Sequence, residues 1–95
     1  MRHLVLFKFE DGFFDHDVYR MVSEVMQELC IQLPDDVLTA KAYSNIVDRP
    51  GNYDLMLELT LAGEASLDRY LSHPVHQALI RSLAPHRRSR ISFDC

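Results

Sequence analysis

The sequence is poor in several residue types that mark particular classes of protein. It has no tryptophan, three glycines and two cysteines. The cysteines, Cys30 and Cys95, have neither the pattern of a disulfide framework nor the spacing of a metal-binding pair. No apolar run approaches the roughly 18 residues that a membrane-spanning helix needs. Lys8 places a charge where a signal peptide keeps an apolar stretch, so we expect a cytoplasmic protein with no membrane partner.

Positive charge is also scarce. Lys and Arg number 10 against 14 Asp and Glu, which gives a formal net charge of −4. A nucleic-acid-binding protein needs a basic surface, so we expect no nucleic-acid partner. One basic cluster is present, at His86, Arg87, Arg88 and Arg90. It predicts either a site for a phosphate or acidic ligand or solvated charges that keep a sheet edge from pairing with another chain.

Hydrophobic residues, in contrast, make up 47% of the 95 residues, which is generous for a chain of one-domain length. Their spacing predicts strands at 2–9, 37–46, 53–61 and 88–94. From Asp15 the apolar residues follow the spacing of an amphipathic helix, which ends near Pro34. A second helical region follows Gly63 and is interrupted at Ser72-His73-Pro74, where Pro74 suits the first position of a new helix.

The order of these elements predicts the fold and an assembly. Strand, helix, two strands, helix and strand form the ferredoxin-like α+β unit, here a single domain over 1–95. Its antiparallel four-stranded sheet carries two helices on one face. The leucines of the third strand face those helices, so Leu4, Leu6 and Met56 point to the uncovered face. Apolar side chains on an uncovered sheet predict a homodimer packed through that sheet face.

Three segments resemble the stress-responsive A/B barrel (Dabb) family. They are the first strand at 2–9, the hairpin segment at 45–55, and residues 70–77, which match the family's Y-x-x-H-P-x-H pattern. The resemblance covers nearly the whole chain and implies a dimeric α+β barrel. Some members of the family are polyketide cyclases that close rings by aldol chemistry, and most have no assigned activity.

The resemblance also implies candidate catalytic residues. In a plant cyclase of this family, a Tyr and a His of the pattern form the catalytic pair, and they match Tyr70 and His76. A pocket His on the first strand is matched by His3. A further pocket His on the third strand is replaced by Leu55, which argues against the same substrate.

These residue types suit acid–base chemistry that needs no metal or organic cofactor. An imidazole can remove a proton next to a carbonyl group, and a phenol can hold the enolate that forms. We therefore predict His76 as base, Tyr70 as donor and His3 as an orienting group. The pocket is expected between the sheet and the helices that carry Tyr70 and His76. The predicted substrate-binding residues are Val5, Phe7, Leu55, Leu57 and His73.

Other interpretations of the same residues stay open. His73 and His76 can instead stabilise the broken helix while Tyr70 fills the core. His3, His73 and His76 can also be considered as a three-His metal site, although Pro74 complicates that geometry. Two functions follow. One is a cofactor-independent cyclase or isomerase for a small apolar carbonyl compound, and the alternative is a non-catalytic, stress-associated protein that binds a small molecule in the same cavity.

Overall fold

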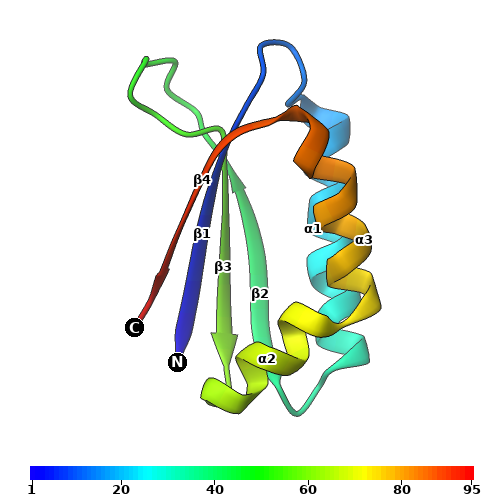
Figure 1. Ribbon diagram of the computed structural model, residues 1–95. Helices are drawn as coiled ribbons and strands as arrows, with labels where there is room; N and C mark the ends of the chain where they lie inside the picture. Colours follow the sequence, from blue (N-terminus) through cyan, green and yellow to red (C-terminus); the bar gives the residue numbers. More distant parts are fainter.

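The computed structural model describes residues 1–95 and has the predicted ferredoxin-like α+β fold (Figure 1). Its elements are β1 (Arg2–Phe9), α1 (His16–Gln32), β2 (Val37–Ser44), β3 (Leu55–Leu61), α2 (Glu64–Ser72), α3 (Pro74–Leu83), a 3-10 turn (Ala84–His86) and β4 (Arg87–Asp94). The antiparallel sheet has the order β2-β3-β1-β4. All three helices lie on one face of the sheet and the other face is uncovered (Figure 1).

The core lies between the sheet and the helices, as the alternation predicted. Side chains that point toward the helices from β1 and β3 are at most 3% exposed: His3, Val5, Phe7, Phe9, Leu55, Leu57, Leu59 and Leu61. Helix α1 contributes Val22, Met26 and Leu29, which are fully buried. Its N-terminus is capped by Asp15, whose carboxylate accepts a hydrogen bond of 2.9 Å from the Val18 N–H.

The β2–β3 connection is longer than the sequence predicted, because β2 ends at Ser44 and β3 begins at Leu55. One main-chain bond, from the Asn45 N–H to the Asp54 carbonyl at 3.0 Å, follows the last strand residues, and side-chain hydrogen bonds form within the loop beyond it. The Asn45 amide donates to the Val47 carbonyl at 2.7 Å, and the Asn52 amide donates to Asn45 Oδ1 at 3.2 Å. The loop leans away from the helices, toward the uncovered side of the sheet (Figure 1).

A buried carboxylate joins the start of β2 to α2. Asp36 is 8% exposed and accepts a hydrogen bond of 2.8 Å from the Ser66 hydroxyl. It also accepts two hydrogen bonds from the Arg69 guanidinium, at 2.8 and 2.9 Å. These bonds hold the pKa of Asp36 below its ordinary value.

The uncovered sheet face carries an apolar patch. Leu4, Leu6 and Met56 are half-buried there, as the sequence predicted. Pairing with β1 places Ile91 opposite Leu6 and Phe93 opposite Leu4, on the same face. Ile91 and Phe93 are 50% and 65% exposed. None of the helices has both the length and the apolar character required to cross a bilayer.

Candidate active site

The break between α2 and α3 positions His76. Pro74 has no N–H, and the Val75 N–H donates to the ring of His73 at 3.1 Å, so neither group bonds to the end of α2. The Leu71 carbonyl is thereby free to accept from His76 Nδ1 at 2.9 Å and from the Gln77 amide at 2.6 Å. A carbonyl oxygen only accepts, so Nδ1 of His76 carries the proton and Nε2 of the neutral ring carries the lone pair.

Three predicted catalytic residues form one cluster. The rings of Tyr70 and His76 have centroids 4.5 Å apart, and those of His3 and Tyr70 are 5.8 Å apart in an edge-on arrangement. Tyr70 is 1% exposed, His3 3% and His76 8%. Residues from β1, α2 and α3 thus meet at the inner surface of the sheet, and their catalytic role stays a prediction.

Burial sets the protonation states in this cluster. Burial disfavours the charged ring and lowers the pKa of His76 below its ordinary value. The hydrogen bond to the Leu71 carbonyl raises this pKa, and the charges of His3 and Arg90 lower it. Burial raises the pKa of the Tyr70 hydroxyl well above its usual range, so Tyr70 keeps its proton. The cluster therefore pairs a neutral imidazole with a protonated phenol at neutral pH.

His3 has a carboxylate partner that sequence reasoning missed. Its Nδ1 is hydrogen-bonded to Asp94 Oδ1 on β4, across the pairing that sets these two residues side by side. The other ring nitrogen, Nε2, is buried and has no hydrogen-bond partner. Buried polar atoms are rarely left unpaired, so this nitrogen is an exception among the buried side-chain polar atoms of the chain.

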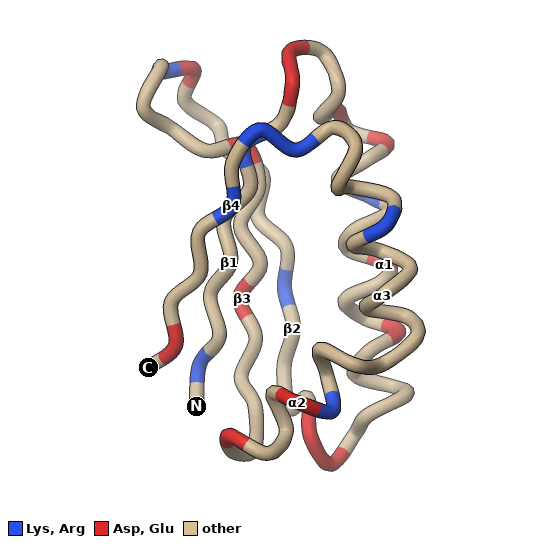
Figure 2. Tube along the Cα trace, viewed as in Figure 1, with Lys and Arg blue, Asp and Glu red and all other residues tan.

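An open cleft adjoins the cluster between α3 and β4. It has a volume of about 510 Å³ and is lined by His76, Ile80, Arg87, Arg88, Ser89 and Arg90. Figure 2 shows the basic residues gathered where the chain enters β4. Of Tyr70, His76 and His3, His76 is the one that lines this cleft.

The other predicted site residues lie elsewhere. The ring of His73 accepts a capping hydrogen bond from the Val75 N–H at the start of α3. Val5, Phe7, Leu55 and Leu57 are packed in the core at 1–2% exposure, and their predicted role in substrate binding stays a prediction. No three His, Cys, Asp or Glu side chains are arranged to hold a metal ion.

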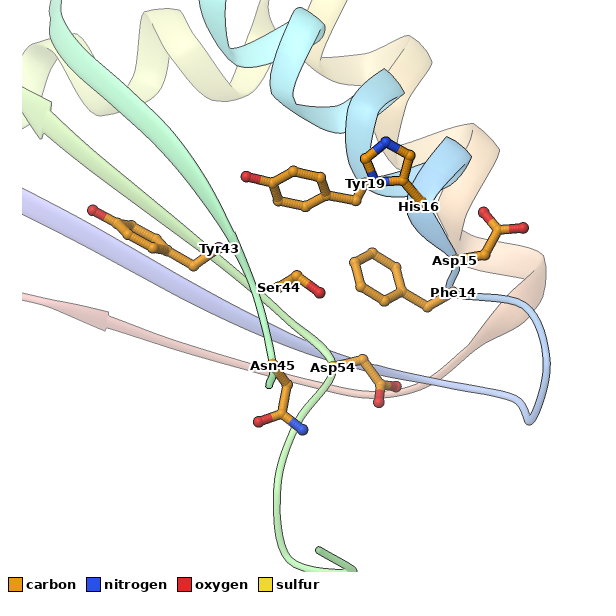
Figure 3. A pocket seen from close by; sticks show the side chains of 8 residues that line it. All are labelled: Phe14, Asp15, His16, Tyr19, Tyr43, Ser44, Asn45 and Asp54. Carbon is orange, nitrogen blue, oxygen red and sulfur yellow. The ribbon is translucent and has the colours of Figure 1, made fainter. Parts of the chain in front are cut away.

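A second pocket lies at the opposite side of the fold, between the start of α1 and the end of β2 (Figure 3). Its volume is about 600 Å³, and it is lined by Phe14, Asp15, His16, Tyr19, Tyr43, Ser44, Asn45 and Asp54. Several of its polar groups already have structural partners. The Tyr19 hydroxyl donates to the Ala42 carbonyl at 3.1 Å, and Asp54 accepts from the Phe9 N–H at 2.8 Å. None of the predicted site residues lines this pocket.

Comparisons with known proteins agree with the geometry. The model of the stress responsive A/B barrel domain matches residues 1–95. An uncharacterized protein of Streptomyces coelicolor, SCO4036, is 40% identical over 80 residues, which cover 82% of this chain and 80% of that protein.

Two solved structures show the same fold. A dimeric ferredoxin-like protein of unknown function from Thermobifida fusca has a TM-score of 0.78 and 26% identity, over 97% of this chain and 85% of that one. A hydroxynitrile lyase from Passiflora edulis has a TM-score of 0.75 and 14% identity, over 97% of this chain and 87% of that one. The full-length family match and the Streptomyces relative identify the chain as a member of the stress responsive A/B barrel domain family.

Proposed function

We propose that this protein is a cofactor-independent enzyme that acts on a small carbonyl compound by cyclisation or isomerisation, with His76 as base and Tyr70 as hydrogen-bond donor. The observation that carries the proposal is the contact between a neutral imidazole and a protonated phenol, 4.5 Å apart between ring centres, beside an open cleft. A protein of the same fold is named as a lyase, which is consistent with acid–base chemistry on this scaffold.

The reaction begins with proton transfer. Nε2 of His76 takes a proton from the carbon next to the carbonyl, and the electron pair of that C–H bond forms an enolate. The Tyr70 hydroxyl donates a hydrogen bond to the enolate oxygen and stabilises its charge. In cyclisation the enolate carbon then bonds to a second carbonyl carbon, whose oxygen takes the proton from His76. In isomerisation the His76 imidazolium returns the proton to a different atom of the enolate.

His3 and Asp94 support the same chemistry. The Asp94 carboxylate accepts from Nδ1–H of His3, which turns Nε2 toward the interior beside Tyr70. We assign Asp94 the role of a positioning residue, since it acts through His3. The unpartnered Nε2 atom of His3 is the group that a polar atom of the substrate can meet.

We further propose that the chain forms a homodimer through the uncovered sheet face. That face exposes Ile91 and Phe93 next to half-buried Leu4, Leu6 and Met56. The Thermobifida fusca protein of the same fold is dimeric. Burying these apolar side chains against an identical face would remove them from water, which favours association.

Solvent deuterium exchange tests the enzymatic proposal without knowledge of the natural substrate. Small 1,3-diketones and aryl methyl ketones are incubated with the protein in heavy water, and loss of the proton next to the carbonyl is followed by NMR. We expect exchange above the buffer rate, and a fall of about a hundredfold or more in His76→Gln, the range for loss of a general base. Tyr70→Phe should slow exchange while the fold is kept.

The exposed His16, remote from the cluster, supplies the matched control His16→Gln, which should exchange at the wild-type rate. The enzymatic proposal is wrong if the wild type never exceeds the buffer rate or if His76→Gln exchanges at the wild-type rate.

The alternative is a stress-associated protein that binds a small molecule in this site without turning it over. The buried, unpartnered Nε2 of His3 favours it as a second candidate, because a bound polar group satisfies that atom with no reaction. Ligand-induced shifts without exchange would support this alternative.

A further inference from the structure

We propose that the cleft between β4 and α3 holds an oxyanion of the substrate, a carboxylate or a phosphoryl group, on the guanidinium of Arg90 beside His76. The proposal deepens the function proposed above by naming a substrate class, and its role in turnover rests on that function. The binding site itself is tested separately. It adds an anionic group to the small, largely apolar carbonyl compound that the sequence predicted as substrate.

The first observation is the placement of Arg90. The pairing of β4 with β1 sets Arg90 opposite Phe7, on the helix-facing side of the sheet, in the same row as Ser92 and Asp94. Charges that only protect a sheet edge need no particular face, whereas this guanidinium lies on the side of the proposed catalytic cluster. Its positive charge is close enough to affect both Tyr70 and His76.

The second observation is the composition of the cleft. Three of its six lining residues are arginines, and the remaining three are His76, Ile80 and Ser89. A chain with a net charge of −4 therefore concentrates positive charge at the one cleft that its candidate base lines. Such a cleft attracts anions and raises their local concentration.

The third observation is that Arg90 has no acidic partner. Three carboxylates on or beside β4 and the β1–α1 turn are already engaged: Asp94 with His3, Glu10 with His86 at 2.5 Å, and Asp11 with Arg88 at 3.5 Å. Arg90 makes neither an ion pair nor a side-chain hydrogen bond, and its side chain is exposed to solvent. A planar guanidinium presents paired N–H donors that match the two oxygens of a carboxylate or phosphoryl group.

These observations give the substrate an orientation. An oxyanion on Arg90 at the cleft, with Ile80 against the apolar part of the molecule, directs the carbonyl end toward His76. Holding the substrate at one end in this way positions the reacting carbon next to the base. Arg87, which also lines the cleft and has no acidic partner, adds to its positive charge.

Binding of three matched probes tests the site. Benzoate and phenyl phosphate carry the two oxyanions, and benzamide is their neutral counterpart; each is titrated into the protein and followed by calorimetry and NMR. We expect benzoate or phenyl phosphate to bind with shifts at His76 and Ile80, and benzamide to bind at least about tenfold more weakly. Comparison of the two anions shows whether the group is a carboxylate or a phosphoryl group.

Variants locate the anchor. Arg90→Gln should weaken anion binding by about tenfold or more. Arg90→Lys keeps the charge but loses the paired N–H donors of the guanidinium, so its anion affinity should lie between those of Arg90→Gln and the wild type. Arg49, in the β2–β3 loop and outside every cleft described, supplies the charge-matched control Arg49→Gln, which should bind as the wild type does. Unchanged melting temperatures exclude loss of fold.

The oxyanion proposal is overturned if benzamide binds as tightly as the tighter of the two anions, if neither anion binds, or if Arg90→Gln binds the anions as tightly as Arg49→Gln. Its failure is distinguishable from failure of the proposed enzyme. Anion binding that Arg90→Gln weakens, in a wild type that never exchanges above the buffer rate, would refute the enzyme and leave the oxyanion site in place. Exchange above the buffer rate with no preference for anions would do the reverse.

Discussion

Nδ1 of His76 lies 2.9 Å from the main-chain oxygen of Leu71, five residues earlier in the chain. This bond exists because the helix is broken between the two residues, at His73 and Pro74. In an uninterrupted helix the Leu71 oxygen would accept from the N–H four residues on, at Val75. The Y-x-x-H-P-x-H pattern therefore has a physical basis: Pro74 and His73 release a carbonyl that fixes the tautomer of His76.

Removal of the His73 ring should destabilise the start of α3. In His73→Ala the Val75 N–H loses its 3.1 Å capping bond, so we expect the free energy of unfolding to fall by about 1 kcal/mol. Urea denaturation followed by circular dichroism measures it. The exposed His16 is the control, since His16→Ala removes no hydrogen bond shown by the structure. Equal stabilities of the two variants would contradict the capping role.

As the pH is lowered, deuterium exchange should fall at a pH below the ordinary pKa of histidine. Burial lowers the pKa of His76, so the ring stays neutral, and competent as a base, to a lower pH than a solvated imidazole. We expect the midpoint of the fall in deuterium exchange to lie below about 6.5, the ordinary value for a solvated imidazole. Ring NMR signals assigned with His76→Gln measure the titration directly. A His76 midpoint above 6.5 would be inconsistent with a desolvated base.

Asp36 should contribute to the pH dependence of stability. The bonds from Arg69 and Ser66 lower its folded pKa below the unfolded value of about 3.9. The unfolded chain then takes up a proton more readily, so the contribution is present above the unfolded pKa and is lost as pH falls through the folded one. The free energy of unfolding should therefore decline in acid more steeply for the wild type than for Asp36→Asn.

Urea titrations at a series of pH values between neutral and strongly acidic compare the two proteins. The neighbouring Asp35 is exposed and makes no hydrogen bond, so Asp35→Asn serves as the matched control and should follow the wild-type pH dependence. At neutral pH we expect Asp36→Asn to be the least stable of the three proteins. Parallel curves for Asp36→Asn and Asp35→Asn would mean that the buried bonds to α2 add no stability.

A charge on the uncovered sheet face should weaken self-association. Leu6 lies opposite Ile91 at the centre of the apolar patch, so Leu6→Glu would bury a carboxylate in the proposed interface. Light scattering at micromolar concentration should give a dimer mass for the wild type and a lower mass for this variant. Ile31, 72% exposed on α1, provides the control Ile31→Glu, which should remain dimeric. A monomeric wild type would refute the dimer.

Local sequence patterns determined the fold. The alternation in β1 and β3, the apolar stripe of α1 and the break at His73-Pro74 were each predicted from neighbouring residues, and the structure confirmed the fold that they imply. These features are local, because side-chain periodicity and the missing proline N–H act within a few residues. The predicted ends of the β2–β3 loop were wrong by two residues each, and side-chain hydrogen bonds of Asn45 and Asn52 stabilise the longer loop.

The composition of the site was decided by tertiary structure. The resemblance led to Tyr70, His76 and His3, but neither it nor spacing indicated that Asp94 meets His3 or that Arg90 faces the helices. His3 and Asp94 are 91 residues apart and become neighbours only through the antiparallel pairing of β1 with β4. The alternation of Ile91 and Phe93 does imply that Arg90, Ser92 and Asp94 share the other face. Which face the helices cover, and whether they reach the edge strand, depends on packing between distant elements, and that packing leaves the cleft beside β4 open.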